Sequence, residues 1–196
     1  MEKTIVELGI KLNKDYKYYH KILELHGFYN AYVFNTRDIY YTNKDLNGLT
    51  ENEMKKSCIR IRISASQNHS PKSCKIETND LIDDDMFTIS INELEEYENK
   101  LIQRGFKKVF DTYKVDYHYC KQEVCSRIQL QEIKKIGLML YYDNEKYYEL
   151  ESYEQRKKLI DDLNSYGFSF TYNELGLDKL RTLFYGKEMF SLNQNA

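Results

Sequence analysis

Apolar and polar residues alternate along much of the chain, most clearly in the run Cys-Ile-Arg-Ile-Arg-Ile-Ser that starts at Cys58. In a strand, the three isoleucines of this run fall on one face and the two arginines, Arg60 and Arg62, on the other. Two guanidinium groups so spaced form a fork that suits phosphate oxygens. A single pair of this kind is also typical of a solvated strand face in an antiparallel sheet. The pattern therefore predicts a strand and leaves two interpretations of its polar face.

The same alternation predicts further strands, and helical periodicity predicts the segments between them. The expected strands cover residues 4–13, 28–34, 59–63, 74–78, 107–120, 125–133, 135–142 and 146–152, with 38–41 as a short strand or turn. Helices are expected over residues 15–25, 92–104, 153–166 and 177–185, and residues 43–56 form a loop or short helix. About eight or nine strands with three or four helices indicate an α+β fold with a dominant antiparallel sheet.

Three of the expected helices end in a glycine followed by a phenylalanine. Glycine supplies the left-handed conformation that often stops a helix. Unequal spacing between the three pairs excludes a solenoid, and the arrangement suggests two halves in which a helix leads into antiparallel hairpins. The pairs are Gly27-Phe28, Gly105-Phe106 and Gly167-Phe168.

Composition narrows the class of protein. A chain of 196 residues can bury a sizeable core, and we expect a single domain over 1–196. The net charge is −2 with 31% charged residues, which gives no overall basic field for nucleic acid or an acidic membrane surface. No apolar run approaches the roughly 20 residues of a membrane span, and the acidic start lacks the apolar segment of a signal peptide. We expect a cytoplasmic protein.

The cysteines and histidines do not indicate a metal site. The four cysteines, Cys58, Cys74, Cys120 and Cys125, lack zinc-finger or knuckle spacing relative to one another and to the four histidines. Without a secretory signal, reduced thiols are the expectation for a chain of this size.

Charged residues recur on the polar faces of the expected strands. If these faces contact water, they form an ordinary mixed surface. If the sheet closes into a barrel around them, the interior holds cations suited to a polyanion and acids suited to a divalent metal. Alternation alone does not choose between the two. The residues are Glu7, Lys11, Arg60, Arg62, Lys75, Glu77, Lys114, Arg127, Glu149 and Glu151.

The order of these residues resembles the CYTH family of triphosphate tunnel metalloenzymes, which includes class IV adenylate cyclases, thiamine triphosphatases and inorganic triphosphatases. The resemblance covers nearly the whole chain. It implies a closed or nearly closed antiparallel β-barrel of eight strands with flanking helices. The motifs that carry it are Glu7-Leu8-Gly9-Ile10-Lys11 for Glu-x-Glu-x-Lys, Asp38-Ile39-Tyr40-Tyr41 for the tyrosine-rich segment, Arg60-x-Arg62, a lysine strand at Lys75 and a late Glu149-x-Glu151.

The resemblance also implies roles for individual residues. Glu7 and Lys11 would be catalytic, and Mg²⁺ or Mn²⁺ would be the cofactor. The substrate would be a small molecule containing a triphosphate, with a homodimer as one option and no nucleic acid or membrane partner. Phosphates would be bound by Lys11, Arg60, Arg62, Lys75, Lys114 and Arg127, and the metal by Glu7, Glu149 and Glu151.

Two positions depart from the family pattern. Gly9 replaces the second glutamate, which removes a carboxylate from the metal side and leaves a cavity that water could occupy. Asp116 stands where many members carry an arginine. Metal-dependent hydrolysis of an inorganic, nucleoside or thiamine triphosphate is the first expectation. The alternatives are class IV adenylate cyclase activity, a catalytically reduced module that binds a nucleotide or polyphosphate, and a structural domain with solvated strand faces.

Overall fold

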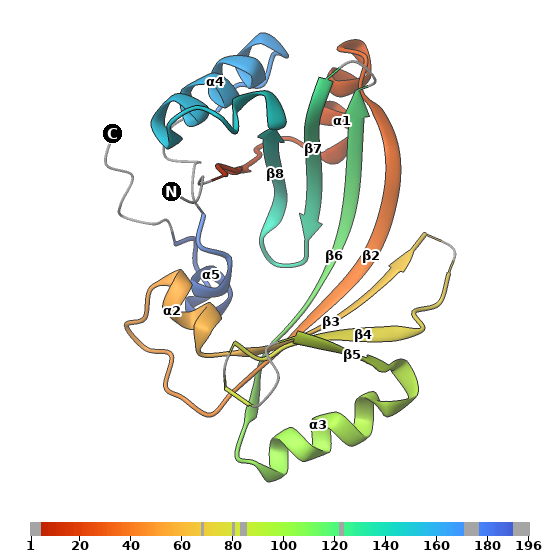
Figure 1. The fold of residues 1–196 in the computed structure, drawn as a ribbon, viewed down its shortest axis with the longest axis vertical. Coiled ribbons are helices and arrows are strands. Elements are labelled where there is room, and N and C mark those ends of the chain that lie inside the picture. Colours follow the sequence, from red (N-terminus) through yellow and green to blue (C-terminus); the bar gives the residue numbers. More distant parts are fainter. Residues whose placement is uncertain are drawn as a thin grey trace. The chain divides into compact units, whose positions relative to one another are not determined.

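The computed structural model describes residues 5–67, 69–79, 81–82, 86–121, 124–170 and 177–189. Eight strands form one sheet in the order β1-β8-β7-β6-β2-β3-β4-β5 (Figure 1). The strands are β1 (Leu8–Lys11), β2 (Tyr29–Thr42), β3 (Ile59–Ser66), β4 (Ser73–Glu77), β5 (Met86–Ser90), β6 (Lys107–Lys121), β7 (Val124–Ile133) and β8 (Gly137–Asn144). The helices are α1 (Tyr16–Leu25), α2 (Glu51–Lys56), α3 (Leu94–Gln103), α4 (Ser152–Ser165) and α5 (Lys179–Tyr185), with short 3-10 helices η1 (Ile91–Glu93) and η2 (Glu145–Tyr147).

The α+β prediction with a dominant antiparallel sheet is confirmed, since the strand pairs whose register is defined are antiparallel. The strand order has β1 at one end and β5 at the other, so the described strands are not closed into a barrel by hydrogen bonds. Of the two barrel forms expected from the sequence, this order agrees with the nearly closed one.

The chain divides into two compact units, which we describe separately. Unit 1 is formed by Met1–Val33, Asp116–Ile133 and Gly137–Leu177, and unit 2 by Phe34–Val115, Lys134–Ile136 and Asp178–Ala196. The long strands β2 and β6 each contribute residues to both units. A single domain over the whole chain stays a prediction.

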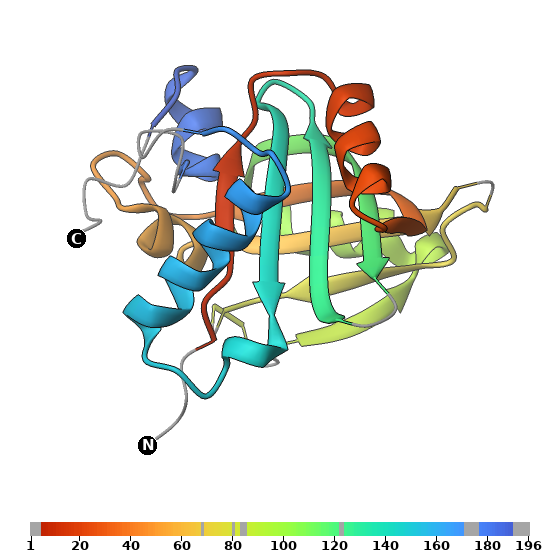
Figure 2. The same ribbon diagram turned by 90° about the horizontal axis from the view of Figure 1, so that it is seen from above.

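The core of unit 1 lies between one face of its strands and two helices, α1 and α4, which cover that face (Figure 2). Alternation along β1, β7 and β8 directs the apolar side chains toward these helices. The apolar strand faces of this unit therefore pack against helices. The buried strand residues are Leu8, Ile10, Ile128, Leu130, Leu138, Leu140 and Tyr142, and the helices add Tyr19, Leu23, Leu159 and Leu163.

The core of unit 2 is built on β3. Ile59, Ile61 and Ile63 are 0%, 0% and 8% exposed, and they pack in one cluster with Leu101 of α3 and with Phe106, which follows that helix. This confirms the predicted apolar face of the strand. The opposite face of β3 therefore carries Arg60 and Arg62, whose surroundings are described below.

The three Gly-Phe pairs stop helices α1, α3 and α4 in the same way. Each glycine is left-handed, with φ of 80°, 86° and 83° in chain order. The N–H of each phenylalanine donates to the carbonyl five residues earlier, at 3.0 Å in all three cases, which is the Schellman arrangement. Each phenylalanine is buried, so the stop also anchors the helix end in a core.

Two expected boundaries are wrong because pairing, rather than local pattern, decides them. Residues 28–34 and 38–41 belong to one continuous strand, β2, whose second half pairs with β3 from Phe34 to Tyr41. Strand β5 was not expected after the acidic run. It forms because it pairs with β4 and places Phe87 and Ile89 against the core of unit 2.

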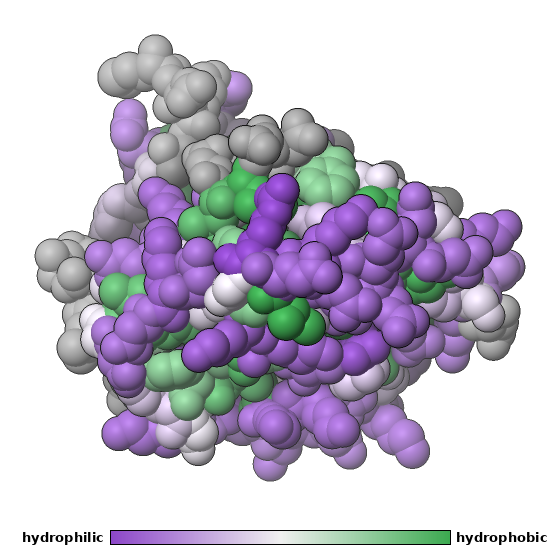
Figure 3. Space-filling model, turned by 90° about the horizontal axis from the view of Figure 1, so that it is seen from below, coloured by the Kyte–Doolittle hydropathy of each residue, from purple (hydrophilic) through white to green (hydrophobic). Residues whose placement is uncertain are grey.

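The helices, the surface and the cysteines can be compared with what the composition led us to expect. Within the described ranges, no helix combines the length and the apolar sequence needed to cross a membrane. The face drawn in Figure 3 is largely hydrophilic, with hydrophobic residues in small separate groups. Cys58, Cys74 and Cys120 carry free thiols.

The core of unit 2 gives the first testable prediction. Ile61→Ala should lower the free energy of unfolding by about 3 kcal/mol, since it removes fully buried methyl and methylene groups and leaves a cavity. The matched control is Ile102→Ala on α3. Ile102 is 58% exposed, so its truncation should change stability by less than about 0.5 kcal/mol. Urea denaturation of both variants measures the difference; equal losses would contradict the assigned core.

Candidate functional site

Charged side chains gather on the face of the unit 2 sheet that lies opposite its isoleucine core. Register places Asp38 opposite Arg62 and Arg62 opposite Lys75, while the neighbouring row runs from Tyr40 through Arg60 to Glu77. Lys114 of β6 is 9% exposed and lies close enough to Asp38 to lower the pKa of its carboxyl. We call this group the cationic face of unit 2; its members are Asp38, Tyr40, Arg60, Arg62, Lys75, Glu77 and Lys114.

Arg62 is held by Asp38 in a two-point ion pair. Its Nε and Nη2 donate to the two carboxylate oxygens at 2.7 and 2.9 Å, and the Asp38 side chain is 6% exposed. Burial would raise the pKa of Asp38, but the hydrogen bonds and charge of Arg62 outweigh it and hold this pKa below its usual value. Asp38 therefore stays ionised and fixes the plane of the Arg62 guanidinium.

Arg60 has a different partner. Its Nη2 donates to a carboxylate oxygen of Glu77, and the other oxygen of Glu77 lies 3.6 Å from Nζ of Lys75. Nε of Arg60 is buried and has no hydrogen-bond partner. A buried donor without an acceptor costs free energy. The Arg60 side chain is thus only partly satisfied by its surroundings.

Charge on this face favours anions. Four cationic side chains, Arg60, Arg62, Lys75 and Lys114, share the face with two carboxylates, which leaves a formal excess of two positive charges. The chain as a whole carries a net charge of −2, so this excess is local. Such a group of cations can attract and orient a small polyanion.

Unit 1 has a polar face of its own on strands β1, β8, β7 and β6. Register places Gly9 opposite Tyr141, and Tyr141 opposite Gln129. A Cβ atom at Gly9 would lie 3.3 Å from Cε1 of Tyr141, so the tyrosine ring lies against the glycine. The cavity expected at Gly9 is therefore absent at this position, because the ring fills it.

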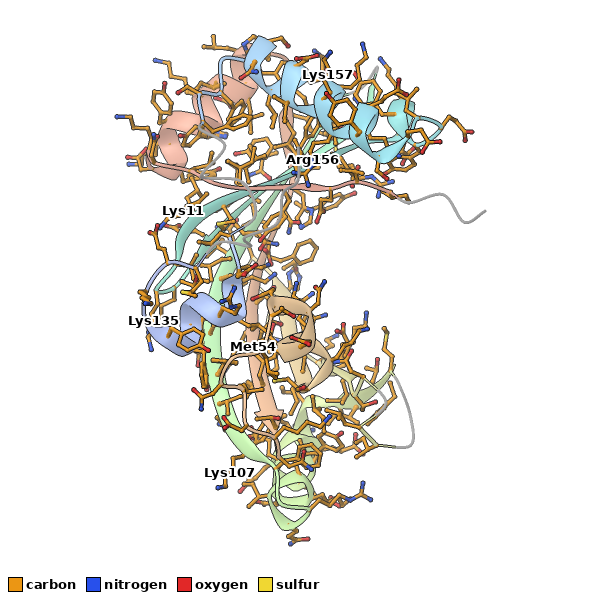
Figure 4. The ribbon with its side chains drawn as sticks, turned by 90° about the vertical axis from the view of Figure 1, so that its left-hand side faces the viewer. Lys11, Met54, Lys107, Lys135, Arg156 and Lys157 are labelled. Atoms are coloured by element: carbon orange, nitrogen blue, oxygen red, sulfur yellow. The ribbon has the colours of Figure 1, made fainter. Side chains whose placement is uncertain are left out.

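Lys11 and Arg127 lie on this polar face. Lys11 ends β1 opposite Met139, with its side-chain Cε near Gly137 (Figure 4). Arg127 pairs in register with Asp143 and donates to Glu145 at 2.5 Å. The charges of Asp143 and Glu145 raise the pKa of Arg127, whose side chain is 68% exposed. Both expected phosphate ligands of unit 1 are thus on strand faces, but Arg127 lies beside carboxylates.

Asp143 of unit 1 has one carboxylate oxygen without a hydrogen-bond partner, while its side chain also bonds to Tyr148. Its Oδ1 is buried and has no hydrogen-bond partner, and burial raises the pKa of its carboxyl despite the nearby charge of Arg127. Extending the β1–β8 register by one residue would set Glu7 opposite Asp143. Asp143 lies on a strand of the sheet, whereas Glu149 and Glu151 follow the last strand.

Asp116 and His118, two residues apart on β6, lie on the same face of the strand. Gln129 of β7 donates to Asp116 at 3.2 Å and lies 3.3 Å from Nε2 of His118. Asp116 is 4% exposed. The acid at this departure from the family pattern is thus part of a buried polar network.

The expected strand over residues 146–152, with Glu149 and Glu151 side by side, is wrong. Asn144 accepts from the N–H of Lys146 and starts η2, and Glu151 is the residue before the first turn of α4. Tyrosines 147 and 148 favour strands in isolation, but Tyr147 instead donates to Asp162 of α4. The late Glu-x-Glu therefore lies in a turn rather than on the sheet.

The predicted metal ligands come from segments that meet at Gln155 of α4. Its Oε1 accepts from the N–H of Val6, next to Glu7, and its Nε2 donates to the carbonyl of Leu150, between the two late glutamates. Among the described residues, however, no three His, Cys, Asp or Glu side chains lie together as a metal site. The segments are brought together, but Glu7, Glu149 and Glu151 do not fit a preassembled metal centre.

Comparison with known proteins identifies the fold. No protein-family model matches the sequence, and no curated protein matches it significantly. Solved structures do match. The PH1819 protein of Pyrococcus horikoshii aligns at 20% identity with a TM-score of 0.54, covering 87% of this chain and 97% of that one. Two bacterial proteins described as "putative adenylate cyclase" also align. The one from Vibrio parahaemolyticus has 14% identity, TM-score 0.50 and coverage of 88% and 98%, and the one from Bacillus halodurans has 10%, 0.51, 86% and 92%.

The chain shares the fold of these proteins. The α+β fold with one antiparallel sheet of eight strands, expected from the order of its motifs, is thereby confirmed. Identities of 10 to 20% carry no residue-level roles, so the site rests on the geometry above.

Sequence reasoning missed two contacts on the polar faces of the sheet. Tyr141 was not expected to face Gly9, and Glu77 was not expected to hold Arg60. Alternation gave the correct faces for these residues. Pairing Gly9 with Tyr141 needs the register between β1 and β8, and pairing Arg60 with Glu77 needs the register between β3 and β4. The sequence offers no signal for either register.

The pH dependence of stability tests the Asp38–Arg62 pair. The pKa of Asp38 is lowered by folding, so its contribution is present above the unfolded value of about 3.9 and is lost as pH falls through the lower folded pKa. Asp38→Asn should cost about 2 kcal/mol at neutral pH. Urea denaturation from about pH 5 to about pH 3 should then show a smaller loss for the variant than for wild type.

The control is Asp111→Asn, which removes a carboxylate paired with Arg37 in a similar two-point geometry but on the other face of the sheet. Its side chain is 30% exposed, and its removal should cost less than about 1 kcal/mol. Equal pH dependence in wild type and Asp38→Asn would contradict the assigned pair.

The contact between Gly9 and Tyr141 is tested by a double-mutant cycle. Gly9→Ala should be more favourable in a Tyr141→Ala background than in wild type, by about 1 kcal/mol, because the new Cβ then meets no ring. Free energies of unfolding for the four proteins give the coupling. A coupling near zero would show that the ring does not pack against Gly9.

Proposed function

We propose that this chain binds a small molecule containing a triphosphate, and that the cationic face of unit 2 is its phosphate-binding surface. The observation that carries the proposal is the grouping of four cationic side chains on one strand face whose opposite side is core. The shared fold adds support, since two of the fold neighbours carry an adenylate cyclase description and ATP is a triphosphate.

The cationic face of unit 2 is better suited to a ligand with several phosphates than to a ligand with a single carboxylate. Arg62 donates two of its N–H groups to Asp38, and its remaining N–H groups can bind a ligand. Arg60 has a buried Nε without a hydrogen-bond partner. Lys75, with a side chain that is 47% exposed, and Lys114 act as point charges beside these planar donors. A phosphate chain offers acceptor oxygens to all of them.

We propose that the protein binds the triphosphate but has reduced catalytic activity toward it. The expected metal ligands Glu7, Glu149 and Glu151 do not form a cluster among the described residues, and Tyr141 occupies the space beside Gly9. Mg²⁺ is often held by one or two carboxylates together with the substrate's phosphates. Any Mg²⁺ or Mn²⁺ requirement is therefore expected only with ligand present, and Glu7 and Lys11 stay predictions as catalytic residues.

Adenylate cyclase activity is the second candidate, favoured by the description of two fold neighbours. In that reaction the ribose 3′-hydroxyl attacks the α-phosphorus and pyrophosphate leaves. Hydrolysis instead uses water as the nucleophile and releases phosphate. Tripolyphosphate, ATP and thiamine triphosphate, each with Mg²⁺ or Mn²⁺, separate these reactions when released phosphate and cyclic AMP are both measured.

Calorimetry with tripolyphosphate tests the binding proposal directly. Arg60→Ala and Arg62→Ala should each weaken binding by about 1.5–3 kcal/mol, the range for hydrogen bonds to charged groups. The matched control is Arg37→Ala, which removes an arginine from β2 on the opposite face of the same sheet. It should leave affinity within about twofold of wild type.

If all three variants lost affinity equally, the loss would reflect only the net charge of the protein, and the assigned binding face would be wrong. Binding without turnover supports the reduced module, phosphate release supports the hydrolase, and cyclic AMP supports the cyclase. No binding of any of the three triphosphates would overturn the proposed function.

A further inference from the structure

Glu77 is an acid held among the cations of a face suited to anions. One of its oxygens accepts from Arg60, and the other lies 3.6 Å from Nζ of Lys75. A carboxylate placed between a guanidinium and an ammonium group occupies the position that a phosphate oxygen would take. It also withdraws two of the four cations from any ligand.

The second acid of the face, Asp38, is held differently. Both of its oxygens accept from one guanidinium, and its side chain is 6% exposed, against 18% for Glu77. Moving Asp38 would break two hydrogen bonds and leave a buried charge. Glu77 divides its oxygens between two partners that are 25% and 47% exposed, and its longer side chain has one more rotatable bond. Glu77 is therefore the acid that a ligand can displace.

The unpartnered Nε of Arg60 points to the same conclusion. Glu77 contacts Arg60 through Nη2 and leaves the buried Nε without an acceptor. A ligand with several oxygens can replace the Glu77 contact at Nη2, and it can also supply the acceptor missing at the buried Nε if the Arg60 side chain turns once Glu77 has moved. Exchange of one carboxylate for a phosphate group thus improves the hydrogen bonding of Arg60.

We propose that Glu77 is an internal competitor for the phosphate subsite between Arg60 and Lys75, and that a bound polyphosphate displaces its carboxylate. The inference rests on the proposed function and adds a residue that sets affinity. Asp38 keeps Arg62 in place when ligand is bound and when it is absent, whereas Glu77 exchanges with the ligand. The Glu77 carboxylate therefore neutralises the subsite when no ligand is bound, and its competition weakens the binding of the ligand.

The test is calorimetric titration of Glu77→Gln with tripolyphosphate in the absence of divalent metal. Glutamine keeps the size of the side chain but removes the competing charge, so affinity should rise about fivefold, as expected for a partly exposed ion pair. Asp111→Asn removes the same charge from an arginine pair on the opposite face and should leave affinity unchanged. Glu77→Thr, with a residue that favours strands, should show the same gain and serves if the glutamine variant does not fold.

The outcomes separate the two proposals. If wild type and both Glu77 variants fail to bind tripolyphosphate, ATP and thiamine triphosphate alike, the proposed function fails. If wild type binds and both variants bind equally well or more weakly, the internal competitor is overturned while the proposed function stands. A gain in Asp111→Asn equal to that in Glu77→Gln would assign the effect to net charge and would also overturn the inference.

Discussion

The two-residue period of the strands is the constraint on which the rest of the structure depends. It allows a strand such as β3 to bury isoleucines on one face while it carries arginines on the other. The core then fixes the backbone, and the backbone fixes the spacing of the charged groups. Because the apolar face cannot be rotated outward without exposing the core, the arginines cannot leave the polar face either.

Charge distribution differs between the polar faces of the two units. The face of unit 2 carries an excess of cations, and its two acids each hold an arginine. The face of unit 1 has Arg127 beside Asp143 and Glu145, and a buried Asp116 in a network with Gln129. Neighbouring cations repel one another unless acids or ligands neutralise them. The acids of unit 2 therefore stabilise a site that would otherwise need a bound anion.

Local features of the fold were predictable, and contacts that depend on register were not. The helix stops at Gly27, Gly105 and Gly167 were read correctly, because the signal lies within a few residues. The turn at residues 148–150 was misread as strand, since its tyrosine and alternating glutamates imitate a strand while hydrogen bonds to α4 decide its shape. Tyr141 opposite Gly9 needed the pairing of two strands that are more than a hundred residues apart.

The contact between Gly9 and Tyr141 limits which side chain position 9 can accept. An acid restored at position 9 would meet the tyrosine ring at its first side-chain atom, before its carboxylate reached the polar face. The ring would have to move by a few tenths of an ångström, and such a change costs packing energy where the ring is held by its neighbours. A side chain at position 9 is therefore coupled to the position of the Tyr141 ring. The residues of the cationic face of unit 2 take no part in this contact, so the phosphate-binding proposal does not depend on it.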